Sequence, residues 1–227
     1  MALLPHGGGD SIRVLWPGFP ETPAPPVFRL ARAFSPPDAE PHHLAAILRA
    51  CPHLEDLELF DRLSESALEA VVAAGPDSLR TISIDQDQEV MNMAERPLPH
   101  TVLAALLSRF RDLRELNICG GLDDRSLEHM HAEVGKALAL ERLRLTGNRF
   151  TSNGIASLAQ CPLNSLHTLV LVPRADSSLN LRALQQLAAS PQLGSLRVLS
   201  GFHGLGMEAR AIVEASPVLH TDLEIDF

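Results

Sequence analysis

The sequence contains no tyrosine, one tryptophan and only three cysteines among its 227 residues. Aromatic residues make up 4% of the chain and hydrophobic residues 45%, so aliphatic side chains must build the core. The cysteines Cys51, Cys119 and Cys161 are odd in number and lack the spacing of metal ligands. They therefore argue against a disulfide framework and favour a reducing compartment.

Lysine is almost absent as well, because Lys136 is the only one and the formal net charge is -9. Phosphate binding needs clustered Lys and Arg, so this composition argues against a nucleic-acid partner. No apolar run approaches the ~20 residues that cross a bilayer, and residues 1–9 lack the regions of a signal peptide. We expect a cytoplasmic protein with no membrane contact; translocation into a host cell by another signal is the alternative.

What the sequence does contain is an apolar triplet, spaced L-x-x-L-x-L, that returns six times. Its first members are 25, 34, 27, 26 and 27 residues apart. The triplets are Leu54/Leu57/Leu59, Leu79/Ile82/Ile84, Leu113/Leu116/Ile118, Leu140/Leu143/Leu145, Leu166/Leu169/Leu171 and Leu193/Leu196/Val198. Helices are predicted between them, with Ser64, Asp124 and Ser152 as N-caps, over residues 42–50, 64–74, 99–110, 124–138, 152–160, 181–190 and 207–215. Such strand–helix units bury their apolar faces only by stacking on neighbours.

Residues 51–59, C-P-H-L-E-D-L-E-L, resemble the signature of cysteine-containing leucine-rich repeats. Ser190 and Ser216, each followed by Pro, stand in looser copies with Ser in place of Cys. Leu140–Asn148 resembles the general leucine-rich motif, whose Asn hydrogen-bonds to neighbouring loop backbones. The resemblance is to the ribonuclease-inhibitor-like repeats of F-box-type and bacterial effector proteins. It implies an α/β fold, a right-handed leucine-rich-repeat solenoid (horseshoe arc) with a parallel sheet on the concave face and helices on the convex face.

The first 41 residues differ from the rest because prolines recur there and preclude a long helix. Two apolar patches, Ile12–Trp16 and Val27–Phe34, are each predicted to form a strand. We expect residues 1–41 to be a Pro-rich N-terminal segment that acts as a cap or is partly disordered. Residues 42–227 are expected to form a leucine-rich-repeat domain of about seven repeats, the last one imperfect.

In such a solenoid the outward strand positions form the usual recognition surface. Here they predict an acidic N-terminal end, a middle that mixes Arg with Glu and a more apolar C-terminal end, with lateral pairs of Arg114 with Glu141 and of Glu115 with Arg142. The predicted protein-binding residues of the concave face are Arg114, Arg142, Arg144, His167, Val170, Val172, Arg197 and Leu199. The alternative is a solvated face whose charges neutralise one another.

A second predicted binding segment is the insertion Asp85–Pro99, which makes the second step about eight residues longer than its neighbours. Loops lengthened in one repeat often carry function, and this one is acidic with two Met residues. Its predicted protein-binding residues are Asp87, Glu89, Met91 and Met93. A tolerated insertion is the alternative, since long loops cost little extra entropy.

No residue pattern in the sequence predicts catalysis, a cofactor or a metal. Cys51 and Cys161 are expected to be buried small residues and Cys119 to face outward. His129 and Glu133 share one helix face, which is more typical of a solvated surface than of a zinc site.

We therefore predict a non-enzymatic protein–protein interaction module, without cofactor or metal, whose partner is another protein. The alternative is a substrate-recognition subunit of a ubiquitin-ligase-type assembly or a bacterial effector acting on host proteins. Self-association through the C-terminal strand, residues 223–227, is a third hypothesis.

Overall fold

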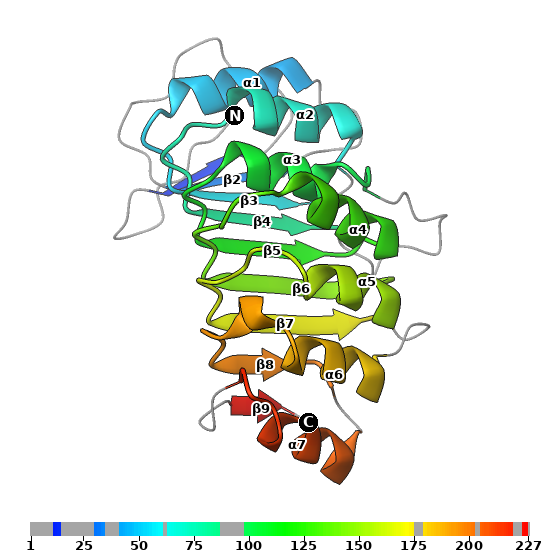
Figure 1. Ribbon diagram of the computed structural model, residues 1–227. Coiled ribbons are helices and arrows are strands. Elements are labelled where there is room, and N and C mark those ends of the chain that lie inside the picture. Colours follow the sequence, from blue (N-terminus) through cyan, green and yellow to red (C-terminus); the bar gives the residue numbers. More distant parts are fainter. Residues whose placement is uncertain are drawn as a thin grey trace. The chain divides into compact units, whose positions relative to one another are not determined.

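The computed structural model describes the backbone of residues 11–14, 30–34, 41–60, 63–86, 98–174, 179–202, 205–219 and 224–226. Side chains are described in these ranges except at 11–14, 30–34, 60 and 224–226. The chain divides into two compact units, Met1–Met93 and Ala94–Phe227. After the first two strands, strands and helices alternate along the described chain (Figure 1).

The first unit is a parallel sheet with two helices in its described part. The strands pair in chain order, so Ala31, Leu57 and Ile82 lie side by side on neighbouring strands, and the helix α1 packs on α2. The elements are β1 (Ser11–Val14), β2 (Leu30–Phe34), α1 (Pro41–Ala50), β3 (Asp56–Phe60), α2 (Glu65–Ala74) and β4 (Thr81–Asp85). The first two strands coincide with the two apolar patches predicted to be strands, whereas the boundary at residue 41 between cap and repeats stays a prediction.

The second unit repeats the same construction. Parallel pairing in chain order aligns Leu116, Leu143, Leu169, Leu199 and Ile225, and each helix from α3 to α7 packs on the next. The elements are α3 (Val102–Arg109), β5 (Glu115–Cys119), α4 (Asp124–Glu133), β6 (Arg142–Asn148), α5 (Ser152–Leu158), β7 (Thr168–Pro173), α6 (Leu181–Ala188), the 3-10 turn η1 (Pro191–Leu193), β8 (Val198–Ser200), α7 (Gly206–Glu214) and β9 (Glu224–Asp226).

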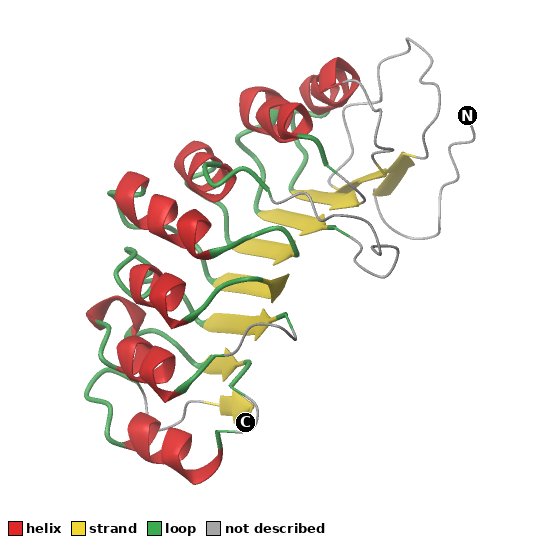
Figure 2. Cartoon of the chain, turned by 90° about the vertical axis from the view of Figure 1, so that its right-hand side faces the viewer, coloured by secondary structure: helices red, strands yellow, loops and turns green. Residues whose placement is uncertain are grey.

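Within each unit the described helices cover one face of the sheet only (Figure 2). The cause is the alternation of the strands: at β4 and β5 every second residue is buried and the residues between are half-exposed. Buried positions carry the apolar triplet, and the positions between point to the opposite face. The helices therefore pack on the triplet side and leave the other side open.

The core is almost wholly aliphatic, as the composition predicts. Leu57, Ile82, Leu116, Leu143 and Leu169 have at most 1% of their surface exposed. Burying one such side chain stabilises the fold by about 1.5–3 kcal/mol. Because each side chain touches those of the adjacent repeats, the stack forms one core per unit.

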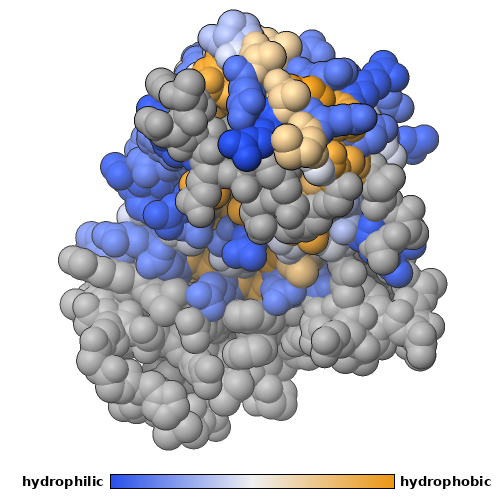
Figure 3. Space-filling view, turned by 90° about the horizontal axis from the view of Figure 1, so that it is seen from below, coloured by the Kyte–Doolittle hydropathy of each residue, from blue (hydrophilic) through white to orange (hydrophobic). Residues whose placement is uncertain are grey.

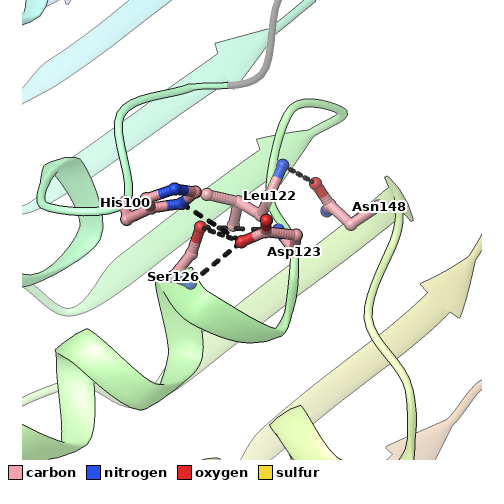
Figure 4. Close-up of polar contacts among 5 residues, drawn as sticks. All are labelled: His100, Leu122, Asp123, Ser126 and Asn148. Atoms are coloured by element: carbon pink, nitrogen blue, oxygen red, sulfur yellow. Dashed lines mark hydrogen bonds and ion pairs between the residues drawn. The ribbon is translucent and has the colours of Figure 1, made fainter.

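Asn148 supplies the hydrogen bonds that the leucine-rich motif predicts for its asparagine. Its side chain is fully buried; it donates to the carbonyls of Ile118 (3.0 Å) and Thr146 (2.9 Å) and accepts from the Leu122 amide at 2.9 Å. Figure 4 shows the Leu122 contact beside Asp123 and Ser126. One amide group thus satisfies the loop that follows β5 and the end of its own strand β6.

Serine replaces cysteine in the last repeats, and the structure gives the physical consequence. Cys51 and Cys161 are fully buried, as predicted. At the equivalent place Ser190, 4% exposed, donates its hydroxyl to the carbonyl of Ala159. Ser216 likewise donates to the carbonyl of Ala188. Each hydroxyl therefore satisfies a backbone acceptor at the end of the helix one repeat earlier, α5 for Ser190 and α6 for Ser216. This bond compensates for burying a polar group.

Six of the seven predicted helices agree with the structure to within about three residues at each end, while α4 ends at Glu133 and not at residue 138. Ser64 is the N-cap of α2, as predicted. The caps of α4 and α5 are Asp123 and Thr151, one residue before the predicted Asp124 and Ser152. The two predicted side chains instead bond to the next repeat.

Candidate functional site

The open face of the second unit is built from three rows of side chains that run across its strands. In the first row Glu115, Arg142, Thr168 and Val198 are register partners. The second row is Asn117, Arg144, Val170 and Ser200, and the third is Cys119, Thr146 and Val172. Neighbouring strands lie ~4.8 Å apart and alternate residues ~6.8 Å apart, so side chains of adjacent rows can contact the same ligand.

The two lateral ion pairs that the sequence predicts are both present. Nη1 of Arg114 lies 3.3 Å from Oε1 of Glu141, and Nη1 of Arg142 lies 3.6 Å from Oε2 of Glu115. All four side chains are partly exposed, so each pair stabilises the fold by about 0–1 kcal/mol. Their main effect is on charge, because they neutralise two of the arginines of this face.

Arg144 is a cation of a different kind. It is exposed, and its register partners are Asn117 on β5 and Val170 on β7. Among the described residues no carboxylate pairs with it. Beside it lie the half-buried Val170 and the more exposed Val172, of which 36% is accessible. An uncompensated guanidinium therefore adjoins apolar surface.

Leu199 was predicted to belong to this face, and that prediction is wrong. Leu199 pairs with Leu169 and is fully buried, whereas Val198 pairs with Thr168 and is half-exposed. The inward residues of β8 are therefore not those of the predicted triplet Leu193/Leu196/Val198. The apolar end of the face consists of Val170, Val172 and Val198.

The last triplet was misplaced in the sequence because Gly201 occupies the position of its third apolar residue. Its φ is +114°, and a Cβ there would lie 1.5 Å from the carbonyl oxygen of Leu171. No side chain fits at this position, so the true triplet of this repeat lacks its last apolar residue. The spacing L-x-x-L-x-L occurs three residues earlier in the sequence by coincidence. The sequence did contain a signal for the correct alignment, because the run Leu163, Leu166, Leu169 is matched by Leu193, Leu196, Leu199 in the next repeat.

Of the other seven predicted face residues, Arg142, Arg144, Val170 and Val172 occupy outward positions on β6 and β7. Arg114, His167 and Arg197 stand one place before β5, β7 and β8. Arg114, Arg142, Arg144, His167 and Arg197 are exposed. His167 and Arg197 occupy successive places at the start of β7 and β8, where the amides of Arg197 and Val198 both donate to the carbonyl of His167. The insertion residues Asp87, Glu89, Met91 and Met93 lie outside the described part of the chain, so that binding segment stays a prediction.

The described outward positions of β3 and β4 in the first unit are acidic or polar, while Arg32 of β2 is the register partner of Glu58. Asp56, Glu58 and Asp85 occupy outward positions on β3 and β4 and are half-buried, and Glu55 precedes β3. This agrees with the predicted acidic N-terminal end.

The cysteine thiols offer little nucleophilic chemistry. Burial raises the pKa of Cys161 to about 12 and also raises the pKa of Cys51. Both therefore remain protonated at neutral pH, and the thiol is a poor nucleophile compared with the thiolate. Cys119 is half-buried in the third row of the open face.

The histidines and carboxylates form no metal-binding group in the part of the chain that the structure describes. The nearest arrangement is His100 with Asp123, whose Nδ1 and Oδ1 atoms lie 3.3 Å apart (Figure 4). That oxygen also accepts the amide and the hydroxyl of Ser126 at 3.1 Å each, so Asp123 is occupied as a helix cap.

Hydrophilic side chains cover most of the described surface seen in Figure 3, with smaller hydrophobic areas between them. No helix of the described residues is long and apolar enough to cross a bilayer. Recognition on such a surface depends on charge and on small apolar patches together, as at Arg144 and Val170.

Comparison with known proteins agrees with this architecture. The sequence matches no family model and is similar to no curated protein. It is similar in structure to a chain of the crystal structure of the yeast Rad7–Elc1 complex, with a TM-score of 0.59 and 20% sequence identity. The match covers 88% of this chain and 49% of that one.

The fold is a leucine-rich-repeat solenoid. At 20% identity the likeness shows the fold alone. The chain spans about half the length of this neighbour, and the neighbour was crystallised in a complex with another protein.

Proposed function

We propose that this chain is a non-catalytic protein-recognition module that binds its partner on the open face of β5–β8. The observation that carries the proposal is Arg144, an exposed cation without an acidic partner among the described residues, beside Val170 and Val172. Val170 and Val172 lie next to each other on one face of β7 and not singly. Exposed apolar groups rimmed by polar ones mark interaction sites.

The regular repeat supports the same function. A stack of strands presents its outward residues in rows at fixed spacing, which gives a partner many weak contacts at once. The structural neighbour, Rad7–Elc1, is itself a protein complex, which supports a protein as the partner here.

Site-specific photo-crosslinking tests this proposal in the cell that makes the protein. A photoreactive p-benzoyl-phenylalanine is placed at position 172 on the open face or, as a control, at the exposed position 128 on α4. We expect a covalent adduct with another protein from position 172 and none of the same mass from position 128. The absence of an adduct specific to position 172 would overturn the proposal.

A second proposal is that the chain is the recognition part of a larger assembly, such as a ubiquitin ligase. It is supported by the extent of the match, since the chain corresponds to only 49% of a neighbour that was crystallised with a second protein. In that case the adduct from the open face would be a target, and the same set of subunits would co-purify whichever target is bound. Purification of only one partner would contradict it. The action of a bacterial effector on host proteins stays a prediction.

A further inference from the structure

We infer that the open face of β5–β8 selects an acidic–aliphatic segment of the partner, in which an Asp or Glu side chain binds Arg144 and an aliphatic side chain two residues away covers Val170. This inference rests on the proposed function and adds the chemistry of the partner to it. It follows from how the charges of the face are already used.

Glu115, the carboxylate that lies closest to Arg144 on the neighbouring strand, is already occupied by other partners. Oε2 of Glu115 faces Arg142 at 3.6 Å, and Oε1 accepts a hydrogen bond from the Asn117 amide at 3.1 Å. Both oxygens are therefore engaged in the first row or along β5. Glu141, the other carboxylate of the face, bonds to Arg114. The structure thus compensates Arg114 and Arg142, whereas Arg144 has no carboxylate partner among the described residues and is open to an external anion.

The apolar part of the site begins directly beside this cation. Val170 is the register partner of Arg144, Val172 lies two residues further along the same strand, and Val198 lies on the next strand. By strand spacing Val170 lies about 7–8 Å from Val172 and from Val198, whereas Val172 and Val198 lie about 14 Å apart on either side of it. Val170 and its surroundings fit one or two aliphatic side chains. Residues i and i+2 of an extended peptide present their side chains to the same face about 6.8 Å apart, which lets one reach Arg144 and the other Val170.

Charge complementarity favours a protein segment that is acidic. The chain as a whole carries a net charge of -9, and the equivalent face of the first unit bears Asp56, Glu58 and Asp85. The net charge disfavours an acidic segment elsewhere, whereas Arg144 attracts it, which restricts where it binds. A nucleic acid needs several free cations in a row, and the ion pairs of Arg114 and Arg142 remove two.

Selection from a phage-displayed library of random dodecapeptides tests the inference. The bait is the full chain, as the natural protein, as Arg144→Gln and as Arg125→Gln. Arg125 is an equally exposed arginine on α4, so its replacement changes the net charge identically. We expect peptides with Asp or Glu two residues from Val, Ile or Leu from the natural protein and from Arg125→Gln, and loss of that enrichment with Arg144→Gln.

Fluorescence polarisation with the best selected peptide then gives the size of the effect. Arg144→Gln should weaken binding about tenfold, because a charge-assisted hydrogen bond is lost. Val172→Ser should weaken it severalfold, and Arg125→Gln should change it less than twofold. Circular dichroism that is unchanged in all variants excludes unfolding as the cause.

The inference is overturned by any of three results: selected peptides that are basic or uncharged, no enrichment at all, or binding that Arg144→Gln leaves intact. Stronger Arg144-dependent binding to a twelve-nucleotide single-stranded DNA would assign the face to nucleic acid and overturn it as well. The inference can fail while the proposed function stands. If position 172 crosslinks to a partner whose attached segment is basic, the recognition module stands and only the acidic–aliphatic inference falls.

Discussion

The carboxylate of Asp124 accepts two hydrogen bonds from Thr151, one repeat further along the chain. One comes from the backbone amide at 2.6 Å and the other from the hydroxyl at 2.7 Å. A third bond reaches the same carboxylate from the amide of Gly154 at 3.1 Å. Asp124 thus holds the N-terminus of α5 against α4, where the positive end of the helix dipole favours its charge.

Replacement of Asp124 by Ala should therefore lower the free energy of unfolding by about 2 kcal/mol, because three donors lose a charged acceptor. Asp124→Asn, which keeps an acceptor, should cost about half as much. Glu128→Ala, at an exposed place on the same helix, should change stability by less than about 0.5 kcal/mol. Urea unfolding followed by circular dichroism measures all three, and equal values for Asp124→Ala and Glu128→Ala would contradict the role of this contact.

Gly154 allows the Asp124 contact by having no side chain. A Cβ at this position would lie 2.4 Å from Oδ1 of Asp124 and 3.1 Å from Cδ1 of Leu127. Helix propensity alone predicts that Gly154→Ala stabilises α5 by about 1 kcal/mol. We expect the opposite sign, a loss of about 1–2 kcal/mol, since the carboxylate must move away.

A double-mutant cycle checks this cause. In the Asp124→Ala background the closest obstacle is gone, so Gly154→Ala should cost at least about 1 kcal/mol less than in the natural protein. Additive effects of the two substitutions would show that they act independently.

Gly201→Ala should be among the most damaging single substitutions of the chain. The Cβ would meet the carbonyl of Leu171, and the backbone has a φ of +114° that other residues rarely adopt. We expect a loss of about 3 kcal/mol or more. Gly135→Ala is the matched control, since nothing lies within 4 Å of its added Cβ; thermal unfolding should place it within a few degrees of the natural protein.

Removal of the Asn148 side chain should destabilise the loops on both sides of β6. Asn148→Ala leaves the amide of Leu122 and the carbonyls of Ile118 and Thr146 without their partner in a buried place. A loss of about 3 kcal/mol follows from such unsatisfied groups. Asn153→Ala, at an exposed position, should have little effect, and faster amide exchange at Leu122 in the Asn148 variant would locate the damage.

Stability should fall in alkali because of Cys161. Burial raises the pKa of its thiol from near 9 to about 12, so the folded state binds this proton more tightly than the unfolded state does. The stabilisation is complete below the pKa of this thiol in the unfolded chain. It is lost as pH rises towards 12, by at most about 1.4 kcal/mol per pH unit. Cys161→Ala should flatten the decline between about pH 9 and pH 11 in urea unfolding. An identical decline in the variant would assign the effect to other groups.

Much of the candidate site could be read from the sequence. The alternation around Leu143 and Leu169 places Arg142, Arg144 and Val170 on the opposite face, and the repeat length places Arg114 beside Glu141. The prediction that Leu199 faces outward failed, because Gly201 replaces the third apolar residue from which the alignment of that repeat is read. The caps of α4 and α5 were missed by one residue, because Asp124 and Ser152 are also good capping residues in isolation.

The sequence by itself determined the strand–helix repeat, the aliphatic core and the burial of Cys51 and Cys161, since these follow from apolar spacing and from composition. Only the tertiary structure decided that Val198 faces outward, that Asp124 bonds to Thr151 and that Arg144 meets no carboxylate among the residues it describes. Each of these depends on contacts between residues about 26–30 positions apart. Such contacts arise only when repeats stack, because stacking fixes which carbonyl, carboxylate or side chain stands beside which.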